Sequence, residues 1–235
     1  MTKIFDRNLF IMLFSIMVGV IIVTYFMADI VNQTKIDQLT AQHTVEIETI
    51  EEMNINFTNN FLESSVLLDS AREFRAFGNY HFDLASLFYT SALSENNISK
   101  INGYKNMSID NCTAAMPKYL NSYLNFESAS NFFNNTKKHT THRNYLDLLN
   151  LYIKLTDSGA KLTMLRYNAS IYLKYLAENI TIQNGSAFVT NETGLMDLLN
   201  MTLMMYGAEA GNYEDIEQDI DEYDIKGFDP KREPS

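Results

Sequence analysis

One uninterrupted apolar segment near the N-terminus constrains this chain more than any other feature. No charged residue lies between Asn8 and Ala28, and residues 9–28 consist mainly of aliphatic and aromatic side chains. Twenty helical residues rise about 30 Å, which matches the hydrocarbon thickness of a bilayer. We therefore predict a single transmembrane helix over residues 9–28, in contact with membrane lipid and preceded by a stub of residues 1–8.

The charges on either side of this segment predict its orientation. Lys3 and Arg7 precede it, whereas Asp29 follows it and the next basic residue is Lys35. Positive charge stays cytoplasmic, so we expect a cytoplasmic N-terminus and an extracytoplasmic remainder in a single-pass protein of the cell membrane. A cleaved signal peptide is the alternative. Its apolar region would be unusually long, and Phe26 stands where a cut after Ala28 needs a small residue.

Asn-x-Ser/Thr sequons follow the apolar segment and none precedes it. The chain has eleven, where its content of Asn, Ser and Thr would give roughly four by chance. Because the charges independently place this part outside the cell, we predict N-glycosylation. We expect the sequon at Asn32 to be skipped, since it lies close to the membrane. The predicted glycosylation sites are Asn56, Asn97, Asn106, Asn111, Asn134, Asn168, Asn179, Asn184, Asn191 and Asn200.

Cysteine content and charge narrow the class of protein further. Cys112 is the only cysteine, so no internal disulfide can form. Sequons without disulfides suit an archaeal cell surface better than a typical eukaryotic ectodomain. The net charge is −11, and residues 205–235 carry ten acids against three bases. No basic patch could neutralise phosphates, so we expect no nucleic-acid binding.

The spacing of apolar residues is helical nearly throughout, and glycine and proline are scarce. We predict an all-α fold in which the transmembrane helix continues into a helical-bundle ectodomain of four to five helices. The expected domains are a stalk or first long helix (29–77), a helical domain (78–210) and an acidic, partly disordered tail (211–235). Within them we expect a turn at Gly78-Asn79. We expect helices over 80–94, about 117–134, about 141–179 and after Thr193, with a break or kink near Gly159. The segments 95–112 and 181–193 are expected to be loops.

Along the stalk, mainly apolar residues recur at steps of three and four, close to a heptad repeat. The seam consists of Ile36, Leu39, His43, Ile47, Ile50, Asn54, Phe57 and Phe61. Such a seam is typical of a coiled coil with another chain, but it also fits packing on the protein's own later helices. We favour the second reading, because regular charge pairing beside the seam is absent.

The stretch after Phe77 contains a glycine, small residues and tyrosines at spacings that loosely resemble a tetratricopeptide repeat. The residues concerned are Gly78, Asn79, Tyr80, Ala85, Tyr89, Ala92 and Leu93. The resemblance covers about one repeat unit. Gly78 lies seven residues before Ala85, where the repeat would have five, and no 34-residue period recurs. It implies a helical hairpin and no particular function.

No motif for catalysis or cofactor binding is present, and we expect neither enzyme activity nor a cofactor. His139 and His142 are three residues apart, but no third metal ligand is near them, so we interpret them as surface histidines. The acids from Asp215 to Asp224 lack the ligand spacing of a calcium loop. In the membrane segment, Ser15 and Gly19 form a small-xxx-small pair that would permit close packing with another helix.

These features lead to two expectations about function. The first is a membrane-anchored, N-glycosylated interaction or scaffold protein of the cell envelope, or an accessory subunit of a membrane assembly. Its partners would be other envelope or membrane proteins, or a second copy of the chain. The alternative is a ligand-sensing helical ectodomain that works through a partner subunit, because only about eight residues remain inside the cell.

Overall fold

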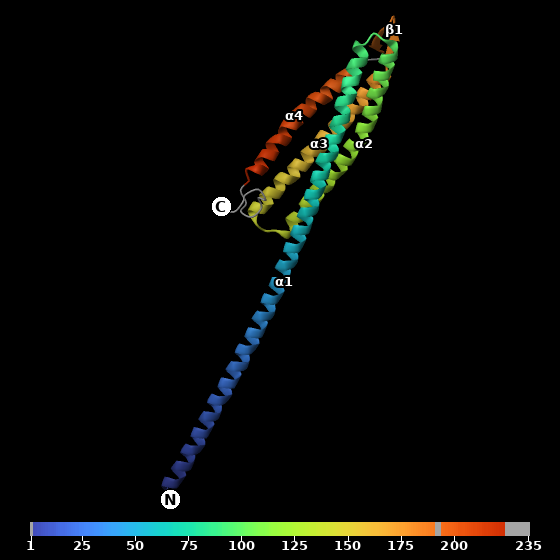
Figure 1. Cartoon of the computed structure of the whole chain (residues 1–235). Coiled ribbons are helices and arrows are strands. Elements are labelled where there is room, and N and C mark those ends of the chain that lie inside the picture. The colour runs from blue at the N-terminus through green and yellow to red at the C-terminus, as the bar shows by residue number, and fades with distance from the viewer. Residues whose placement is uncertain (1, 191–193, 224–235) are drawn as a thin grey trace, which may run out of the picture. The chain divides into compact units, whose positions relative to one another are not determined.

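The computed structural model of the chain describes residues 2–190 and 194–223, with side chains from Met17 onward. Four α-helices account for most of these residues: α1 (Thr2–Ser94), α2 (Ile98–Thr136), α3 (Arg143–Glu178) and α4 (Leu195–Asp221) (Figure 1). A 3-10 turn, η1 (Lys137–His139), joins α2 to α3, and a hairpin of β1 (Ile180–Gln183) and β2 (Ser186–Val189) joins α3 to α4. The predicted all-α class is confirmed, since this hairpin holds the only strands among the described residues.

The chain divides into two compact units between Met53 and Asn54. In the first unit, every side chain from Met17 to Glu52 is exposed. Of the described residues, only the N-terminal part of α1 belongs to a helix long and apolar enough to cross a membrane, a criterion that a signal sequence would also meet. The second unit is a bundle in which residues 54–94 of α1 pack with α2, α3 and α4.

Small residues recur at intervals of seven on the inner faces of three helices. They let the backbones of neighbouring helices approach closely, because only a short side chain separates them. We call this set the small-residue ladder. Its buried members are Ser64, Ala71, Gly78, Ala85 and Ala92 in α1, Ser108, Ala115, Ser122, Ala129 and Thr136 in α2, and Thr156, Thr163, Ser170 and Ala177 in α3.

Hydroxyl groups of the ladder fix the register between α1 and α2. Ser108 Oγ donates a hydrogen bond of 2.8 Å to the carbonyl oxygen of Ala85, and Ser122 Oγ donates one of 2.7 Å to that of Ala71. The two pairs run in opposite directions along the chain, so α1 and α2 are antiparallel. Ser122 Oγ also lies 3.2 Å from Thr163 Oγ1, which extends the same layer to α3. The hydroxyl groups of Ser108 and Ser122 are therefore satisfied by the facing helix, whereas those of Ser64 and Ser170 bond to carbonyl groups of their own helices.

Large side chains fill the space between the ladder layers and form two apolar clusters. One surrounds Tyr119 and the other surrounds Phe126 and Phe133, all three fully buried. The helix expected over about 141–179 is observed as α3, and its residues at helical apolar spacing form a buried seam. Leu148, Leu155, Gly159, Leu162, Ala169, Leu173 and Leu176 are buried, and Tyr152 and Leu165 are half-buried. Ile180, which follows in β1, is also buried.

The predicted turn at Gly78-Asn79 is wrong, because α1 continues through it to Ser94. A Cβ atom on Gly78 would lie 2.6 Å from Tyr119 Cε1, so the glycine serves close helix packing instead of a turn. The helix boundary that the tetratricopeptide resemblance implies is thus not observed, and the domain boundary expected after residue 77 falls inside α1. The break expected near Gly159 is also wrong, since α3 runs through it and Gly159 packs against Phe126.

The predicted loop over 95–112 is also wrong beyond Asn97, because α2 begins at Ile98. Asn97 caps this helix: its Oδ1 accepts hydrogen bonds from the backbone N–H groups of Ser99 (3.0 Å) and Lys100 (3.2 Å). Ile101 and Ser108 are buried and hold the new helix against the bundle. Pro117, expected in a first helical turn, lies inside α2.

The predicted loop over 181–193 is replaced by the hairpin as far as Val189. Asn184 (φ 54°) and Gly185 (φ 80°) both have left-handed backbone conformations, which matches the Asn-Gly turn of a two-residue hairpin. At the C-terminal side, α4 reaches Asp221 and buries Tyr213 and Ile216, so the expected boundary at residues 210–211 falls inside a helix. Residues 224–235 of the tail, including the end over 227–235 for which we expect disorder, lie outside the described residues.

Candidate functional site

The predicted glycosylation sites differ in exposure. Asn97, Asn106, Asn134, Asn184 and Asn200 are exposed, whereas Asn56, Asn111, Asn168 and Asn179 are half-buried. Asn191 lies outside the described residues. The exposed sites lie on α2 and its cap, at the tip of the hairpin and on α4.

Two half-buried sequon asparagines use their side-chain amides within the fold. Asn111 Nδ2 donates to the carbonyl oxygen of Met107, and its Oδ1 lies 3.1 Å from His81 Nδ1. Asn179 Nδ2 donates to the carbonyl oxygen of Tyr175. Because Nδ2 is the atom that would carry the sugar, modification of either residue would have to replace its present hydrogen bond. We therefore rank these two sites below the exposed ones.

One long exposed face of the bundle begins no sequon. We define the α1 face as the exposed apolar side chains Leu62, Val66, Phe77, Tyr80 and Leu87. Leu62, Tyr80 and Leu87 are each about three-fifths exposed (58%, 61% and 57%). No sequon begins between residues 57 and 93. Clustered large apolar side chains on a surface are typical of protein-binding regions.

Arginines on α1 hold α4 against the bundle. Arg72 Nη2 lies 2.5 Å from Glu217 Oε1, and Arg72 Nε donates to Tyr213 Oη at 3.1 Å. One turn further on, the guanidinium of Arg75 stacks 4.4 Å from the ring centre of Tyr213 and 5.7 Å from that of Phe126. These contacts explain why the acidic end of α4 is ordered and packed.

A third arginine, Arg166 on α3, joins α1 and α4 in the same manner. The guanidinium of Arg166 lies 4.6 Å from the ring centre of Phe82 and 4.2 Å from that of Tyr206. Two buried nitrogens in this region, Arg75 Nη1 and Arg166 Nε, have no hydrogen-bond acceptor among the described residues. Cation–π attraction between the flat guanidinium groups and the rings offsets this loss. Here the arginines act as structural clamps.

An aromatic cavity of about 370 Å³ opens beside the first bundle turns of α1. Its lining includes Phe57, Phe61 and Leu62 from α1 and Tyr145 from α3, with Asn54 and Thr58 as polar neighbours. The rings of Phe57 and Tyr145 are 5.7 Å apart. The volume and apolar lining fall within the range of small-molecule sites, at its lower end.

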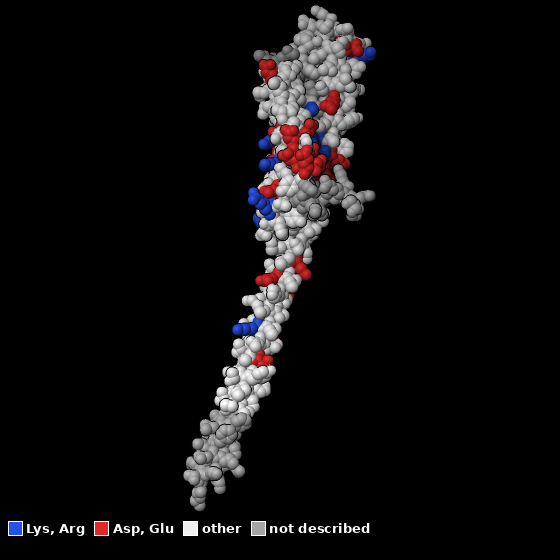
Figure 2. Space-filling model, turned by 90° about the vertical axis from the view of Figure 1, so that its left-hand side faces the viewer, with Lys and Arg blue, Asp and Glu red and all other residues white. Residues whose placement is uncertain are grey.

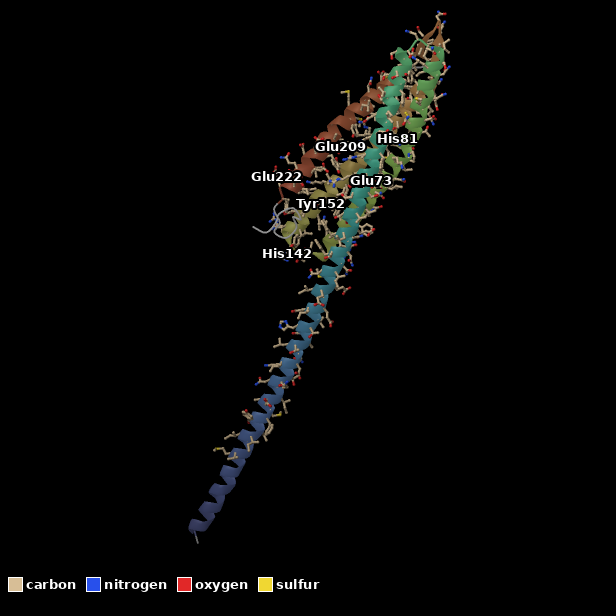
Figure 3. The ribbon with its side chains drawn as sticks, viewed as in Figure 1. Glu73, His81, His142, Tyr152, Glu209 and Glu222 are labelled. Carbon is tan, nitrogen blue, oxygen red and sulfur yellow. The ribbon has the colours of Figure 1, made fainter. Side chains whose placement is uncertain are left out.

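Acidic side chains gather on the side of the bundle where α4 lies (Figure 2). The exposed members on α4 include Glu214, Asp215, Asp219, Asp221 and Glu222. Figure 3 places Glu209 along the same helix and His142 where α3 begins. In the part of the chain that the structure describes, no three His, Cys, Asp or Glu side chains are grouped to hold a metal ion. His142 is exposed and contacts the ring of Tyr145, and His139 is half-buried in η1.

Burial governs the titration of groups in the core. It raises the pKa of the Cys112 thiol to about 12, with a weaker opposing effect of Lys174. It also raises the pKa of Tyr119, Tyr152 and Tyr213 above the ordinary value for tyrosine. The thiol is therefore protonated at neutral pH, and the sulfur is not a reactive nucleophile.

The structure does not test the prediction that Ser15 and Gly19 permit close packing with another membrane helix. Ser15 belongs to the residues whose side chains are not described, and a Cβ atom on Gly19 would meet no atom within 4 Å. The gap in the sequons between residues 57 and 93 already indicated a glycan-free flank where the α1 face lies. The arginine clamps were not predicted from the sequence, although their arginines stand at spacings that belong to the core.

Comparison of the chain with models of protein families, with curated proteins and with solved structures gives no match in any of the three. The class that the fold defines is a helical bundle preceded by one helix able to span a membrane.

Proposed function

We propose that this protein is a membrane-anchored, N-glycosylated interaction protein whose extracytoplasmic bundle binds another component of the cell envelope. The α1 face is the observation that carries the proposal, because it combines exposed apolar side chains with an absence of sequons. Glycans at Asn106 and Asn134 would cover α2, and those at Asn184 and Asn200 would cover the hairpin and α4. The α1 face would remain open to a partner.

The orientation rests on charge and sequon distribution. Lys3 and Arg7 hold the N-terminus in the cytoplasm, and residues 9–28 cross the membrane. We expect protease added to intact cells to remove the bundle, and mass spectrometry of the released fragments to find glycans at the exposed sequons. A bundle that stays intact in the cytosol without glycans contradicts the proposal.

The binding face is tested by a pair of single substitutions. Tyr80→Asp adds a charge to the α1 face, and Leu120→Asp adds the same charge to α2, at a residue that is 45% exposed. We expect both variants to fold, and only Tyr80→Asp to lose the protein that co-purifies in mild detergent. Equal retention by both variants would show that the partner does not use the α1 face.

The aromatic cavity supports a second candidate, a ligand-sensing ectodomain that works through a partner subunit. Leu62 lines the cavity and is largely exposed, so Leu62→Arg would fill the cavity without disturbing the core. Val66→Arg, one turn further along α1, is the control. If the cavity binds small aromatic compounds, isothermal titration with indole gives heat with the native protein and with Val66→Arg, but none with Leu62→Arg. Absence of heat from the native protein argues against this candidate.

A further inference from the structure

Residues 29–53 of α1 carry an apolar seam whose side chains are exposed. Ile36, Ile47 and Ile50 are each more than half exposed, at 56%, 57% and 57%. Phe57 and Phe61, the seam residues inside the bundle, pack with α2 and α3, as expected of a seam that the protein's own helices cover. A helix in water gains nothing from isoleucines on one side unless another surface removes them from solvent.

In the sequence, the seam keeps the seven-residue spacing of the α1 positions that are buried in the bundle. Ile50, His43 and Ile36 lie at multiples of seven residues before Ser64 and Gly78. Counting in sevens from Leu68 leads back to Ile47. In coiled-coil notation, Ile36, His43 and Ile50 are therefore d positions and Ile47 is an a position. The heptad spacing of the buried positions in residues 54–94 thus continues in the sequence of residues 29–53.

The acidic residues beside the seam determine which charges a partner helix can carry. Between Lys35 and Arg72 the chain has seven acidic residues and no Lys or Arg. Glu46 is a g position and Glu51 is the e position five residues later. In a parallel pair of identical helices, g and e' residues at that separation face each other. Two copies of this segment would thus place Glu46 against Glu51 twice, and each contact would be repulsive.

We propose that residues 36–53 of α1 pair with a helix of a different protein, one that presents isoleucine- or leucine-like residues flanked by Lys or Arg. This site is separate from the α1 face and does not depend on it. The partner's cations would meet Glu46 and Glu51, and the same acids would exclude a second copy of this chain. A membrane-anchored partner would be favoured further, because anchoring raises the effective concentration of the two helices.

A single charge reversal tests the pairing rule on the full-length protein in mild detergent. Glu46→Lys would place an ammonium group against Glu51 of a second copy, which turns both repulsive contacts into attractive ones. Glu48→Lys makes the same change of charge at a b position outside the seam. By light scattering at tens of micromolar protein, we expect the native chain and Glu48→Lys to be monomeric and Glu46→Lys to be dimeric. A native chain that is already dimeric through this segment, or a Glu46→Lys variant that stays monomeric, overturns the proposal.

A synthetic helix provides the direct binding test. The probe is a peptide of residues 33–60 in which Glu46, Glu48, Glu51 and Glu52 are replaced by Lys, and the control is the unmodified peptide. We expect the native protein to bind the lysine peptide at least tenfold more tightly, with affinity that falls as salt rises. Ile47→Asp in the protein should abolish binding, whereas Val45→Asp, at an f position away from the seam, should not. Equal binding of both peptides, or binding of neither, contradicts the proposal.

Discussion

Two segments of one helix, residues 54–94 and residues 29–53 of α1, share a heptad spacing but differ in what it does. In the first segment the d positions from Ser64 to Ala92 are small, and α2 and α3 supply matching small residues every seven positions. In the second segment the d positions include Ile36, His43 and Ile50, and all of them are exposed. Heptad spacing therefore indicates a helix face that is suited to pairing, whereas the size of the side chains and the matching spacing of other segments indicate which partner fits it.

The largest expected effect comes from the same substitution made at equivalent d positions of the two segments. Gly78→Leu drives a side chain into Tyr119, and we expect it to lower the free energy of unfolding by about 3 kcal/mol. His43→Leu, five heptads earlier, should leave it within about 0.5 kcal/mol of the native value. Urea unfolding followed by circular dichroism measures both. Equal stability of the two variants would show that the ladder does not hold α1 against α2.

The arginine clamps predict the next effect. Arg75→Ala removes the stacking on Tyr213 and Phe126, and we expect a loss of about 2 kcal/mol. Arg75→Met keeps most of the volume and removes the guanidinium group with its unpaired nitrogen, so its cost should be smaller than that of alanine. Lys35→Ala, in the exposed segment, is the matched control and should be neutral. If the methionine variant lost as much stability as the alanine variant, the side-chain packing of Arg75 would contribute nothing, and the charge would account for the whole effect.

The buried thiol and phenol groups of the core predict that the folded protein is less stable at alkaline pH. Cys112, Tyr119, Tyr152 and Tyr213 have raised pKa values, so they keep their protons to higher pH in the folded state than in the unfolded state. The contribution of these groups to the free energy of unfolding is therefore fully present below about pH 8.5 and decreases as the pH rises towards 12. Each group that is deprotonated only in the unfolded state lowers the free energy of unfolding by roughly 1.4 kcal/mol per pH unit. Urea midpoints at about pH 7 and about pH 10.5, on either side of the thiol's ordinary pKa, measure the decrease. In Cys112→Ala the decrease should be smaller, and an identical decrease would exclude a contribution from the thiol.

The smallest expected effect distinguishes the role of Asn97 as the N-cap of α2 from its role as a glycosylation site. Asn97→Ala removes both the cap and the sequon, and we expect a loss of about 1 kcal/mol. Asn97→Asp removes the sequon but keeps an acceptor for the N–H groups of Ser99 and Lys100. Its stability should match that of the unglycosylated native chain. Thermal unfolding of the three proteins, all produced without glycans, measures the difference, and equal losses in both variants would rule out the cap.

The helical periodicity could be predicted from the sequence because it depends on local spacing. The seam of α3 from Leu148 to Leu176 is an example. The connections were predicted less well, because sequons and glycines were interpreted as loops. Asn97 and Asn106 belong to the cap and body of a helix, and Gly78 is required by a ring on another helix, which no local pattern reveals.

Two features were present in the sequence and could have been recognised. Asn184-Gly185 between Ile182 and Phe188 is a strong hairpin signal, and the structure shows the turn it predicts. The recurrence of small residues every seven positions, from Ser64 to Ala92, could likewise have indicated the close packing of α1 with α2. The arginine clamps are different, since Arg75 and Arg166 meet their rings only after four helices have assembled.

Backbone hydrogen exchange of the full-length protein in detergent tests the contrast between the two segments of α1 most directly. Amides from residues 57–92 should exchange only with global unfolding of the bundle, over hours or longer. Amides from residues 30–53 should exchange within minutes, because a single uncovered helix opens locally. Equal, slow exchange in both segments of the purified protein would contradict the account, since it would mean that the exposed seam already has a partner within the chain or in a second copy.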